Sequence, residues 1–525
     1  MAQASKSIFL SLCFCIIISG LTSGLLWTNS LVIPSNQENW IDVSSPDEQG
    51  LDSSKIDQII VWIRKNNFAI DSLAIIKDDK LVVEEYISLN ENILQLQSHS
   101  DTKHQIASCT KSITSALIGI AIDKGYINSV KDTVLDFFPD YIDSIGIVDA
   151  RKQSMTIEDL LTMRTGLDWW QPGSLSPDHS DPGNNGKQMW NSPDFIEYTL
   201  SQPMVNNPGE VFAYCGGASH LLSAIIERQT GLSTLEFAQE NLFGPIGITD
   251  IYWPRASEGT YVGNGGVRLT TVDMAKFGYL FLNNGYWKGK QIISSEWVNN
   301  STKTHHSFNS YNGYGYQWWT SPETGYYYAL GAYCQRIIIL PEQNMVVVFT
   351  ANIPTYPDPE MALLQHIVSA IDDKETYSKF NFTMNYSPGM VLDERSDISG
   401  SVTNTSGQLD INSNMWPLLK YTVVWESSTS EPSLISNIND YIMNFKSRNP
   451  LIEYSSLGDI FTTTKDTHEL AYQEFKLIEK GTPLWGVISS WYCEETSRSF
   501  IFLYYNLDVD LLPNFEEYID SFNCH

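Results

Sequence analysis

The sequence predicts an α/β domain whose sheet is assembled from two distant segments, followed by a smaller α+β domain. Two strand patterns stand near the start of the first block, over residues 72–77 and 80–87, and four more stand near its end, over 314–352. The chain between them has mostly helical patterns, and strands at both ends of a helical block favour one sheet that unites those ends. A length of 525 residues, with 42% hydrophobic and 18% charged residues, suits two folded domains with a large core.

The first block begins with an amphipathic helix, SSKIDQIIVWIRKNN, at residues 53–67. The strand patterns SLAIIK and KLVVEEYI follow, with the polar pair Asp78-Asp79 as the turn between them. After the helical middle, the segments YGYQWWT, YYYALGAY, CQRIIILP and NMVVVFTAN each predict a strand, and a helix from Pro359 to about Ile371 closes the block. We place this domain at 48–373, after a linker at 28–47.

The second block begins with a stretch rich in Ser, Asn, Thr and Asp, which we expect to be a polar linker over 374–414. A strand over 420–427 then precedes a helix over 433–447 whose apolar residues share one face. Three strand patterns over 469–506 predict an antiparallel meander, and a final helix is expected to begin at Pro513. The sequence therefore predicts a small α+β domain over 415–525, which carries no catalytic constellation and whose partner is unknown.

The N-terminal segment after Lys6 carries no charge from residue 7 to residue 27. About twenty such residues can span a bilayer, and the same pattern serves as the hydrophobic region of a secretory signal. We expect a cleaved signal peptide or a retained signal anchor over 1–27. In both cases the chain touches the membrane only through this segment, and the catalytic domain lies outside the cytoplasm, in the periplasm or the extracellular space.

Charge and motifs exclude several classes of function. The formal net charge of −29 argues against nucleic acid as a partner. The sequence contains no Gly-x-Ser-x-Gly elbow, no phosphate-binding P-loop and no His-Glu-x-x-His motif. The adjacent pair His305-His306 cannot present both rings from one face of a helix or strand, so we expect loop residues there. No metal and no cofactor are expected.

The segment HQIASCTKSITSALIGIAIDKG, residues 104–125, contains Ser108 and Lys111 at the start of an apolar helical pattern. Residues three apart share a helix face, so the lysine amine would lie beside the serine hydroxyl. Burial disfavours the charged ammonium, and a neutral lysine can act as a general base. A second copy of the pattern, at Ser100 and Lys103, stands in a polar run without an apolar helix directly after it and serves as an internal control.

Three downstream segments carry a family resemblance. They are MTIEDLLTMRTGLDWW at 155–170, NPGEVFAYCGGASHLLSAIIERQTGLSTLEFAQENLFGPIGITD at 207–250, and GNGGVRLTTVDMAKFGYLFLNNGYWKGKQIISSEWV at 263–298. Together with the Ser-x-x-Lys helix, the sequence resembles the serine β-lactamase-like family from about Glu48 to Ile371. That family includes class C β-lactamases, D-Ala-D-Ala carboxypeptidases, esterases and 6-aminohexanoate-dimer hydrolases. The resemblance implies a β-lactamase/transpeptidase-like fold, in which an antiparallel sheet is flanked by helices and joined to a helical region.

The resemblance also implies roles for individual residues. Ser108 matches the nucleophile, Lys111 its paired lysine, and Tyr214 in FAYCGG the tyrosine of the Tyr-x-Asn motif. By itself, Tyr214 beside Phe212 would favour a core tyrosine with its hydroxyl bonded to the backbone, and only the family resemblance reverses that interpretation. The backbone N–H groups of Ser108 and Ala332 match the family's oxyanion hole, which is commonly the largest single catalytic contribution.

Two positions depart from the family's pattern. The asparagine of Tyr-x-Asn is Gly216 here, and the lysine of the third motif is Ala329, in Ala329-Leu330-Gly331. Loss of that lysine removes a cation that could hold a substrate carboxylate. The expected contacts to substrate are Trp169, Trp170, Gly216, Gly331 and Tyr333, although the aromatic residues would serve packing as readily.

The sequence therefore predicts an exported serine hydrolase that cleaves an ester or amide bond in a small molecule through an acyl-enzyme on Ser108. Neutral esters are favoured over substrates that carry a carboxylate, because the third motif is apolar. Two alternatives remain: a D-amino-acid peptidase or carboxypeptidase, and a catalytically inactive exported binding or scaffolding protein on a hydrolase fold.

Overall fold

The computed structural model describes residues 40–506, apart from gaps at 88–98, 147–148, 174–176, 310–311, 323–324, 354–359, 372–374, 380–381, 387–389, 396–405, 414–419, 428–432, 449–452, 466–467, 480–481 and 494–497. The predicted signal segment at 1–27 and the predicted helix after Pro513 lie outside the described residues. Within these limits, no helix has both the length and the apolar composition needed to cross a membrane.

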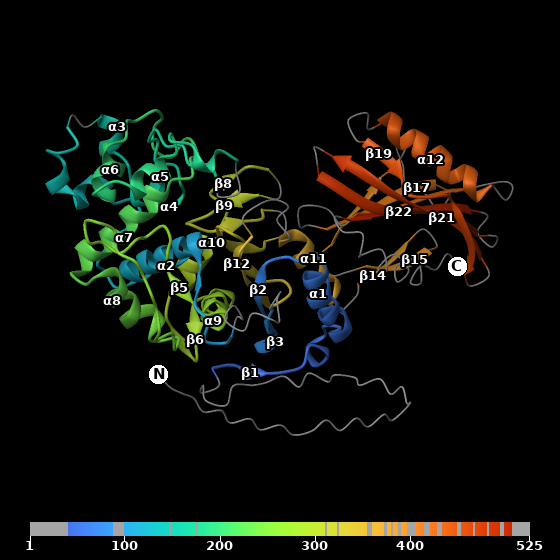
Figure 1. Ribbon diagram of the computed structural model, residues 1–525, viewed down its shortest axis with the longest axis horizontal. Helices are drawn as coiled ribbons and strands as arrows, with labels where there is room; N and C mark the ends of the chain where they lie inside the picture. Colours follow the sequence, from blue (N-terminus) through green and yellow to red (C-terminus); the bar gives the residue numbers. More distant parts are fainter. Residues whose placement is uncertain are drawn as a thin grey trace, which may run out of the picture. The chain divides into compact units, whose positions relative to one another are not determined.

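A nine-stranded sheet forms the centre of the first domain (Figure 1), in the order β1-β3-β2-β13-β12-β11-β10-β9-β8. All neighbouring pairs are antiparallel except β1 with β3. The pairing of β2 with β13 unites the two ends of the domain, which confirms the predicted fold. The strands are β1 (Asp42–Val43), β2 (Ile70–Lys77), β3 (Lys80–Tyr86), β8 (His306–Ser307), β9 (Gly313–Tyr314), β10 (Trp319–Thr320), β11 (Tyr327–Gly331), β12 (Gln335–Leu340) and β13 (Met345–Ala351).

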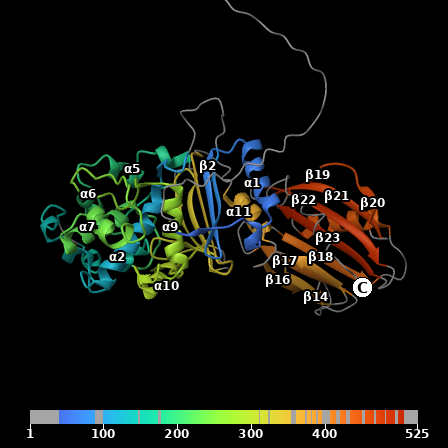
Figure 2. The same ribbon diagram turned by 90° about the horizontal axis from the view of Figure 1, so that it is seen from below.

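Both faces of this sheet are covered by helices, as Figure 2 shows. On one face, α1 (Ser53–Lys65) and α11 (Glu360–Ser369) pack on alternate strand residues such as Leu73 and Ile75. On the other face, residues such as Ala74 and Ile76 pack against the helical region, with α9 (Thr271–Leu282) directly on the sheet. The alternation follows from the pleat of a strand, and it explains why these strands are apolar at almost every position.

The helical region is built around α2 (Thr110–Asp123), whose residues from Thr110 to Ala121 are all buried. It packs against α7 (Gly216–Thr230), so the two helices that carry the predicted motifs are neighbours. The remaining helices of this region are α3 (Ala150–Gln153), α4 (Ile157–Leu161), α5 (Asn185–Trp190), α6 (Phe195–Ser201), α8 (Thr234–Ala238) and α10 (Ser295–Thr302). Two short pairings complete the first domain, besides isolated bridges: β4 (His104–Gln105) with β5 (Arg268–Leu269), and β6 (Tyr286–Trp287) with β7 (Lys290–Gln291).

The segment YGYQWWT is a hairpin and not the single strand that its aromatic composition predicts. Its strands β9 and β10 pair with each other, and the N–H of Gly315 donates to the carbonyl of Trp318 at 2.8 Å. The turn contains Gln317 with a φ of +62°. A β-carbon on Gly315 would lie 2.2 Å from the carbonyl oxygen of Ser301, so the turn is pressed closely against the end of α10.

The second domain is an α+β unit with an eight-stranded antiparallel sheet, in the order β16-β17-β18-β23-β22-β21-β19, and with β20 paired to β21. One helix, α12 (Leu434–Arg448), buries Ile438 and Ile442 against Phe475 and Leu477 of the sheet. The predicted helix and meander are therefore confirmed. The strands are β16 (Met390–Arg395), β17 (Ser406–Ser413), β18 (Lys420–Ser427), β19 (Glu453–Ser456), β20 (Phe461–Lys465), β21 (His468–Glu479), β22 (Thr482–Cys493) and β23 (Arg498–Asn506).

The expected polar linker over 374–414 differs from the structure. That range holds the hairpin β14 (Glu375–Lys379) and β15 (Phe382–Tyr386), and also β16 and β17, which belong to the second sheet. The second domain therefore begins before residue 415. Short apolar runs such as Met390-Val391-Leu392 are separated by polar residues, so composition averaged over this range conceals the strands.

Candidate active site

Ser108 lies in a short 3₁₀ turn, η3 (Ala107–Cys109), that leads directly into α2. One helical turn further on, Lys111 has a side chain that is almost fully buried. Its Nζ donates to Ser108 Oγ at 2.9 Å and to the backbone carbonyl of Asn264 at 2.7 Å. The structure therefore places an amine in hydrogen-bond contact with the serine hydroxyl, as the spacing of the two residues predicts.

The backbone just before Ser108 is held from two sides. The N–H of Ile106 donates to the carbonyl of Val267 at 2.9 Å, beside the short pairing of β4 with β5. On the other side, a β-carbon on Gly331 would lie only 2.4 Å from the carbonyl oxygen of Ile106, so β11 approaches more closely than a side chain allows. Ala107 has a φ of +46°, a costly conformation for a residue with a β-carbon.

Tyr214 lies just before α7, whose first residue is Gly216. The Cys215 thiol caps this helix by accepting from the N–H of Ala218. Lys111 Nζ lies 4.9 Å from the centroid of the Tyr214 ring, within the range of a cation–π contact. Three predicted residues, Ser108, Lys111 and Tyr214, thus meet at one place, although the lysine faces the tyrosine ring and not its hydroxyl.

The strand β11 brings the third predicted motif to the same place through the close approach of Gly331. Ala332 follows, and its N–H donates no hydrogen bond to any residue that the structure describes. The turn to β12 then contains Tyr333 and Cys334, both with positive φ, and the Tyr333 side chain is exposed. Ala329 is buried in the core, so the position of the family's third-motif lysine is closed to solvent.

The two tryptophans of the predicted pocket have different surroundings. Trp170 is 44% exposed, whereas Trp169 is 7% exposed and packs edge-on against Tyr198. The Trp169 indole N–H donates to Gln171 Oε1 at 3.0 Å. Trp169 therefore packs beneath the start of α7, and Trp170 is the more accessible of the two tryptophans. Substrate contact by either ring stays a prediction. The sequence around Trp169 and Trp170 does not indicate which of these two adjacent rings faces inward.

The space that a side chain at Gly216 would occupy is filled by two amides. A β-carbon there would lie 2.8 Å from Asn264 Nδ2 and 3.0 Å from Gln171 Oε1, which already accepts from the Gly216 N–H. Asn264 is buried, and its Oδ1 has no hydrogen-bond partner among the described residues. Sequence reasoning missed both amides, because neither belongs to a motif. The only available signal was the glycine-rich setting of Asn264 in Gly-Asn-Gly-Gly.

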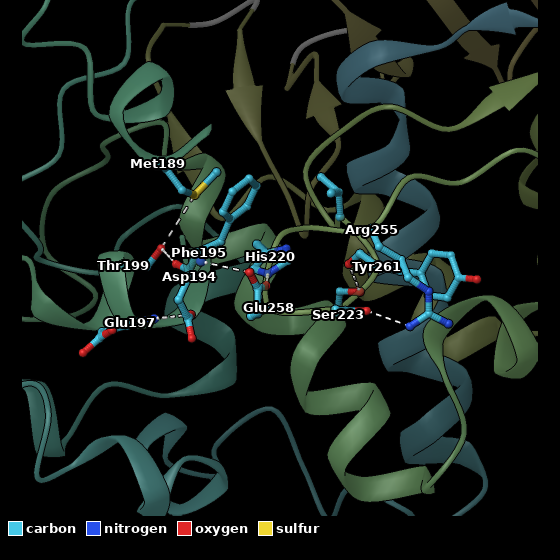
Figure 3. A network of polar contacts seen from close by, with 12 residues as sticks. Met189, Asp194, Phe195, Glu197, Thr199, His220, Ser223, Arg255, Glu258 and Tyr261 are labelled. Atoms are coloured by element: carbon cyan, nitrogen blue, oxygen red, sulfur yellow. Dashed lines mark hydrogen bonds and ion pairs between the residues drawn. The ribbon is translucent and has the colours of Figure 1, made fainter. Parts of the chain in front are cut away.

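A buried polar network anchors α7 behind the tyrosine (Figure 3). His220 Nε2 and Glu258 Oε1 are 2.7 Å apart, and Glu258 Oε2 accepts from the backbone N–H of Phe195 at the start of α6. Burial raises the pKa of Glu258, but the hydrogen bond and charge of His220 together with backbone N–H donors outweigh burial, so the pKa lies below its ordinary value. The contact between His220 and Glu258 thus fixes α7, and with it Tyr214, against α6 and the loop around residue 258.

Gln317, in the hairpin turn between β9 and β10, joins the segments that carry the first two motifs. Its Oε1 accepts from Ser219 Oγ of α7 at 2.6 Å, and its backbone carbonyl accepts from Ser112 Oγ of α2 at 2.7 Å. Its Nε2 donates to the carbonyls of Leu160 and Leu161, each at 3.0 Å. The residue is buried, so these bonds are shielded from water.

Each of the three motifs is accompanied by a buried cysteine: Cys109, Cys215 and Cys334. Burial raises the pKa of the Cys215 thiol to about 12, and this thiol forms no disulfide. His305 and His306 stack on different partners, Tyr316 and Phe212. Among the described residues, no group of three or more His, Cys, Asp or Glu side chains could hold a metal ion.

Comparison with known proteins gives the family of the chain. The family model described as Beta-lactamase matches residues 64–370, more than half of the chain. The chain belongs to the Beta-lactamase family. This membership and the paired Ser108 and Lys111 make it a serine hydrolase.

Known proteins are similar to this chain over part of its length. The chain is 25% identical over 273 residues to a 6-aminohexanoate-dimer hydrolase of Paenarthrobacter ureafaciens, covering 50% of this chain and 68% of that protein. It is 24% identical over 240 residues to a putative D-alanyl-D-alanine carboxypeptidase of Salmonella agona, covering 43% of this chain and 54% of that protein. A solved structure of a putative 6-aminohexanoate-dimer hydrolase from Bacillus anthracis has a TM-score of 0.49 and 23% identity, over 58% of this chain and 80% of that one.

Proposed function

We propose that this serine hydrolase cleaves neutral esters of small molecules through an acyl-enzyme on Ser108. The observation that carries the proposal is the 2.9 Å contact between Lys111 Nζ and Ser108 Oγ beside the ring of Tyr214. An amine in contact with a hydroxyl at a helix start can accept its proton as the oxygen attacks a carbonyl carbon. Export of the catalytic domain, with residues 1–27 as signal peptide or anchor, is part of the same proposal.

The reaction has two halves. Ser108 Oγ bonds to the carbonyl carbon, its proton passes to Lys111, and the oxyanion is held by the N–H groups of Ser108 and Ala332. The bond to the leaving oxygen then breaks, and Tyr214 delivers a proton to that oxygen. The proton that Lys111 took from Ser108 then restores the Tyr214 hydroxyl. In the second half, water attacks the acyl carbon, one water proton passes through Tyr214 and Lys111 to Ser108 Oγ as the bond between that oxygen and the acyl carbon breaks, and an acid is released.

Neutral substrates are favoured because the third motif offers no accessible cation. Ala329 is buried, and the guanidinium of Arg336 is also buried, where its Nη1 donates to the carbonyls of Gly331 and Gln335. A free carboxylate on the substrate would therefore lack a charge-assisted partner on this strand. The side-chain amides of Asn264 and Gln171 occupy the space beside Gly216. The lack of a side chain at Gly216 therefore gives no reason to prefer an ester substrate over an amide substrate.

The test is a screen of the purified chain over p-nitrophenyl acetate, a D-Ala-D-Ala peptide, a chromogenic cephalosporin, and paired substrates that carry a free carboxylate or its methyl ester. Ester hydrolysis that favours the methyl ester and is lost in Ser108→Ala is expected. Preference for the free acid would overturn the substrate class. Activity that persists in Ser108→Ala but disappears in Ser100→Ala would overturn the nucleophile.

A further inference from the structure

Three aromatic side chains continue outward from Tyr214, and we call Phe308, Trp319 and Tyr328 the aromatic strip. The Trp319 ring lies 6.2 Å from that of Tyr214, with 22° between their planes. The Tyr328 ring lies 6.4 Å from that of Trp319 at 19°, and the Phe308 ring lies 6.1 Å from that of Trp319 at 30°. The rings thus share similar orientations, and the row begins at a residue that the proposed reaction uses.

The strip is accessible on its outer side and supported on its inner side. Phe308 is 44% exposed, and Trp319 and Tyr328 are each half-buried. The buried Tyr314 packs edge-on against Trp319 at 5.1 Å and 87°. A supported row of accessible rings is a feature of binding sites rather than of ordinary protein surface.

The histidine that lies beside the strip, His306, is uncharged at neutral pH. Burial, with the positive charge of Arg164, lowers the pKa of His306, whose ring stacks on Phe212 beside Phe308. Since the ordinary value for histidine is about 6.5, this ring is neutral at pH 7. Flat, uncharged surfaces of this kind favour flat, uncharged groups in a ligand.

The position of the strip indicates which half of the substrate it contacts. In the proposed reaction, Tyr214 delivers a proton to the leaving oxygen, while the carbonyl oxygen lies toward Ser108 and Ala332. A group attached to the leaving oxygen therefore lies on the Tyr214 side of the site, where the strip begins.

We propose that the aromatic strip binds the alcohol half of the substrate, and that this alcohol carries an aromatic ring. The inference rests on the proposed ester hydrolysis and adds the class of leaving group to it. In the first half-reaction the carbonyl carbon gains its bond to Ser108 Oγ and loses its bond to the alcohol oxygen. That oxygen takes the proton from Tyr214, and the neutral aromatic alcohol then leaves along Trp319.

Matched esters test the proposal. Phenethyl acetate and cyclohexylethyl acetate differ only in whether the ring of the alcohol is flat, and ethyl acetate has no ring. We expect kcat/KM to favour the phenethyl ester about two- to tenfold, as expected from a ring contact of ordinary strength. Trp319→Leu and Phe308→Leu should reduce this preference toward unity, and the rate with ethyl acetate, which has no ring, gives each variant its own reference. Trp190→Leu, at a 48% exposed tryptophan on α5, is the control and should retain the preference.

The outcomes distinguish a failure of the aromatic-alcohol proposal from a failure of the proposed ester hydrolysis. Loss of hydrolysis of all three esters to the same extent in both strip variants would assign the strip a structural role and overturn the inference. A second pair, methyl phenylacetate and methyl cyclohexylacetate, places the ring in the acyl half. If Trp319→Leu changes that preference and leaves the phenethyl preference intact, the assignment to the alcohol half is wrong. If the wild-type chain hydrolyses no ester, the proposed function itself fails. Phe308→Leu remains informative if Trp319→Leu does not fold, since Phe308 is largely exposed.

Discussion

Replacing Gln317 with leucine should destabilise the first domain strongly, although this residue belongs to no motif. The side chain is buried and accepts from Ser219 Oγ while donating to the carbonyls of Leu160 and Leu161. Leucine has a similar size but no polar atoms, so the change removes all three bonds without opening a large cavity. The carbonyl of Leu161 keeps its bond from the backbone N–H of Gln317, whereas Ser219 Oγ and the carbonyl of Leu160 lose the partner that the side chain provides.

The magnitude follows from the groups left without partners. A buried polar group that loses its hydrogen bond costs about 1–3 kcal/mol, so two such groups give a loss of about 2–6 kcal/mol in the free energy of unfolding. Adding Ser219→Ala to Gln317→Leu removes one of those groups. The double variant should therefore recover about 1–2 kcal/mol relative to Gln317→Leu alone, which is an interaction between neighbours and not an additive effect.

Urea unfolding followed by tryptophan fluorescence measures these differences. The matched control is Gln188→Leu: Gln188 is exposed, yet its amide also donates to the carbonyl of Pro182 and accepts from Tyr198. Water replaces those bonds, so the control should lose less than about 1 kcal/mol. If Gln317→Leu is no more destabilising than Gln188→Leu, or if Ser219→Ala adds its full cost to that of Gln317→Leu, the reasoning is refuted.

Further predictions concern the nucleophile, one carboxylate and one glycine. Ser108→Ala should lower kcat for p-nitrophenyl acetate by at least about a thousandfold with little change in stability, whereas Ser100→Ala should be silent; equal losses in both would contradict the assignment. Burial raises the pKa of Asp71 to about 6, so the folded state binds more protons than the unfolded state between about pH 4 and pH 6. The charged carboxylate therefore destabilises the folded state at pH 7, and Asp71→Asn should raise the free energy of unfolding in urea more at pH 7 than at pH 4. Equal effects of the substitution at both pH values would count against this. Gly216→Asn, which restores the family residue, should lower kcat/KM because its β-carbon meets Asn264 Nδ2 at 2.8 Å, and a gain of cephalosporin hydrolysis would show that the neighbouring amide gives way.

Sequence patterns were sufficient for the parts of the fold that depend on local periodicity. The helix at 53–67, the strands at both ends of the first domain and the meander of the second domain appear close to their predicted bounds. In each, apolar residues recur with the period of one element, and burial follows that period. The hairpin within YGYQWWT was missed because its turn is fixed by contacts with Ser301 and Leu161, which lie far away in the sequence.

The same distinction applies to the candidate site. Ser108, Lys111 and Tyr214 could be named from their motifs, and the structure brings them together. The inward position of Trp169 and the supporting roles of Asn264, Gln317 and the His220–Glu258 pair could not, because each depends on tertiary packing rather than on spacing. Residues that hold a site in place seldom carry a motif of their own, since what they must match is a neighbour in space.

The pairing of β2 with β13 joins Ser72 to Thr350, which are 278 residues apart in the chain. Contacts this distant in sequence form slowly, because a long segment must be organised before the two strands can meet. During synthesis, β2 and β3 leave the ribosome long before β13 exists. If the chain is exported as we propose, its N-terminal strands cross the membrane ahead of their partner. The central sheet then closes only after residue 351 has followed, and until that moment the β2 edge is open to pairing with other chains.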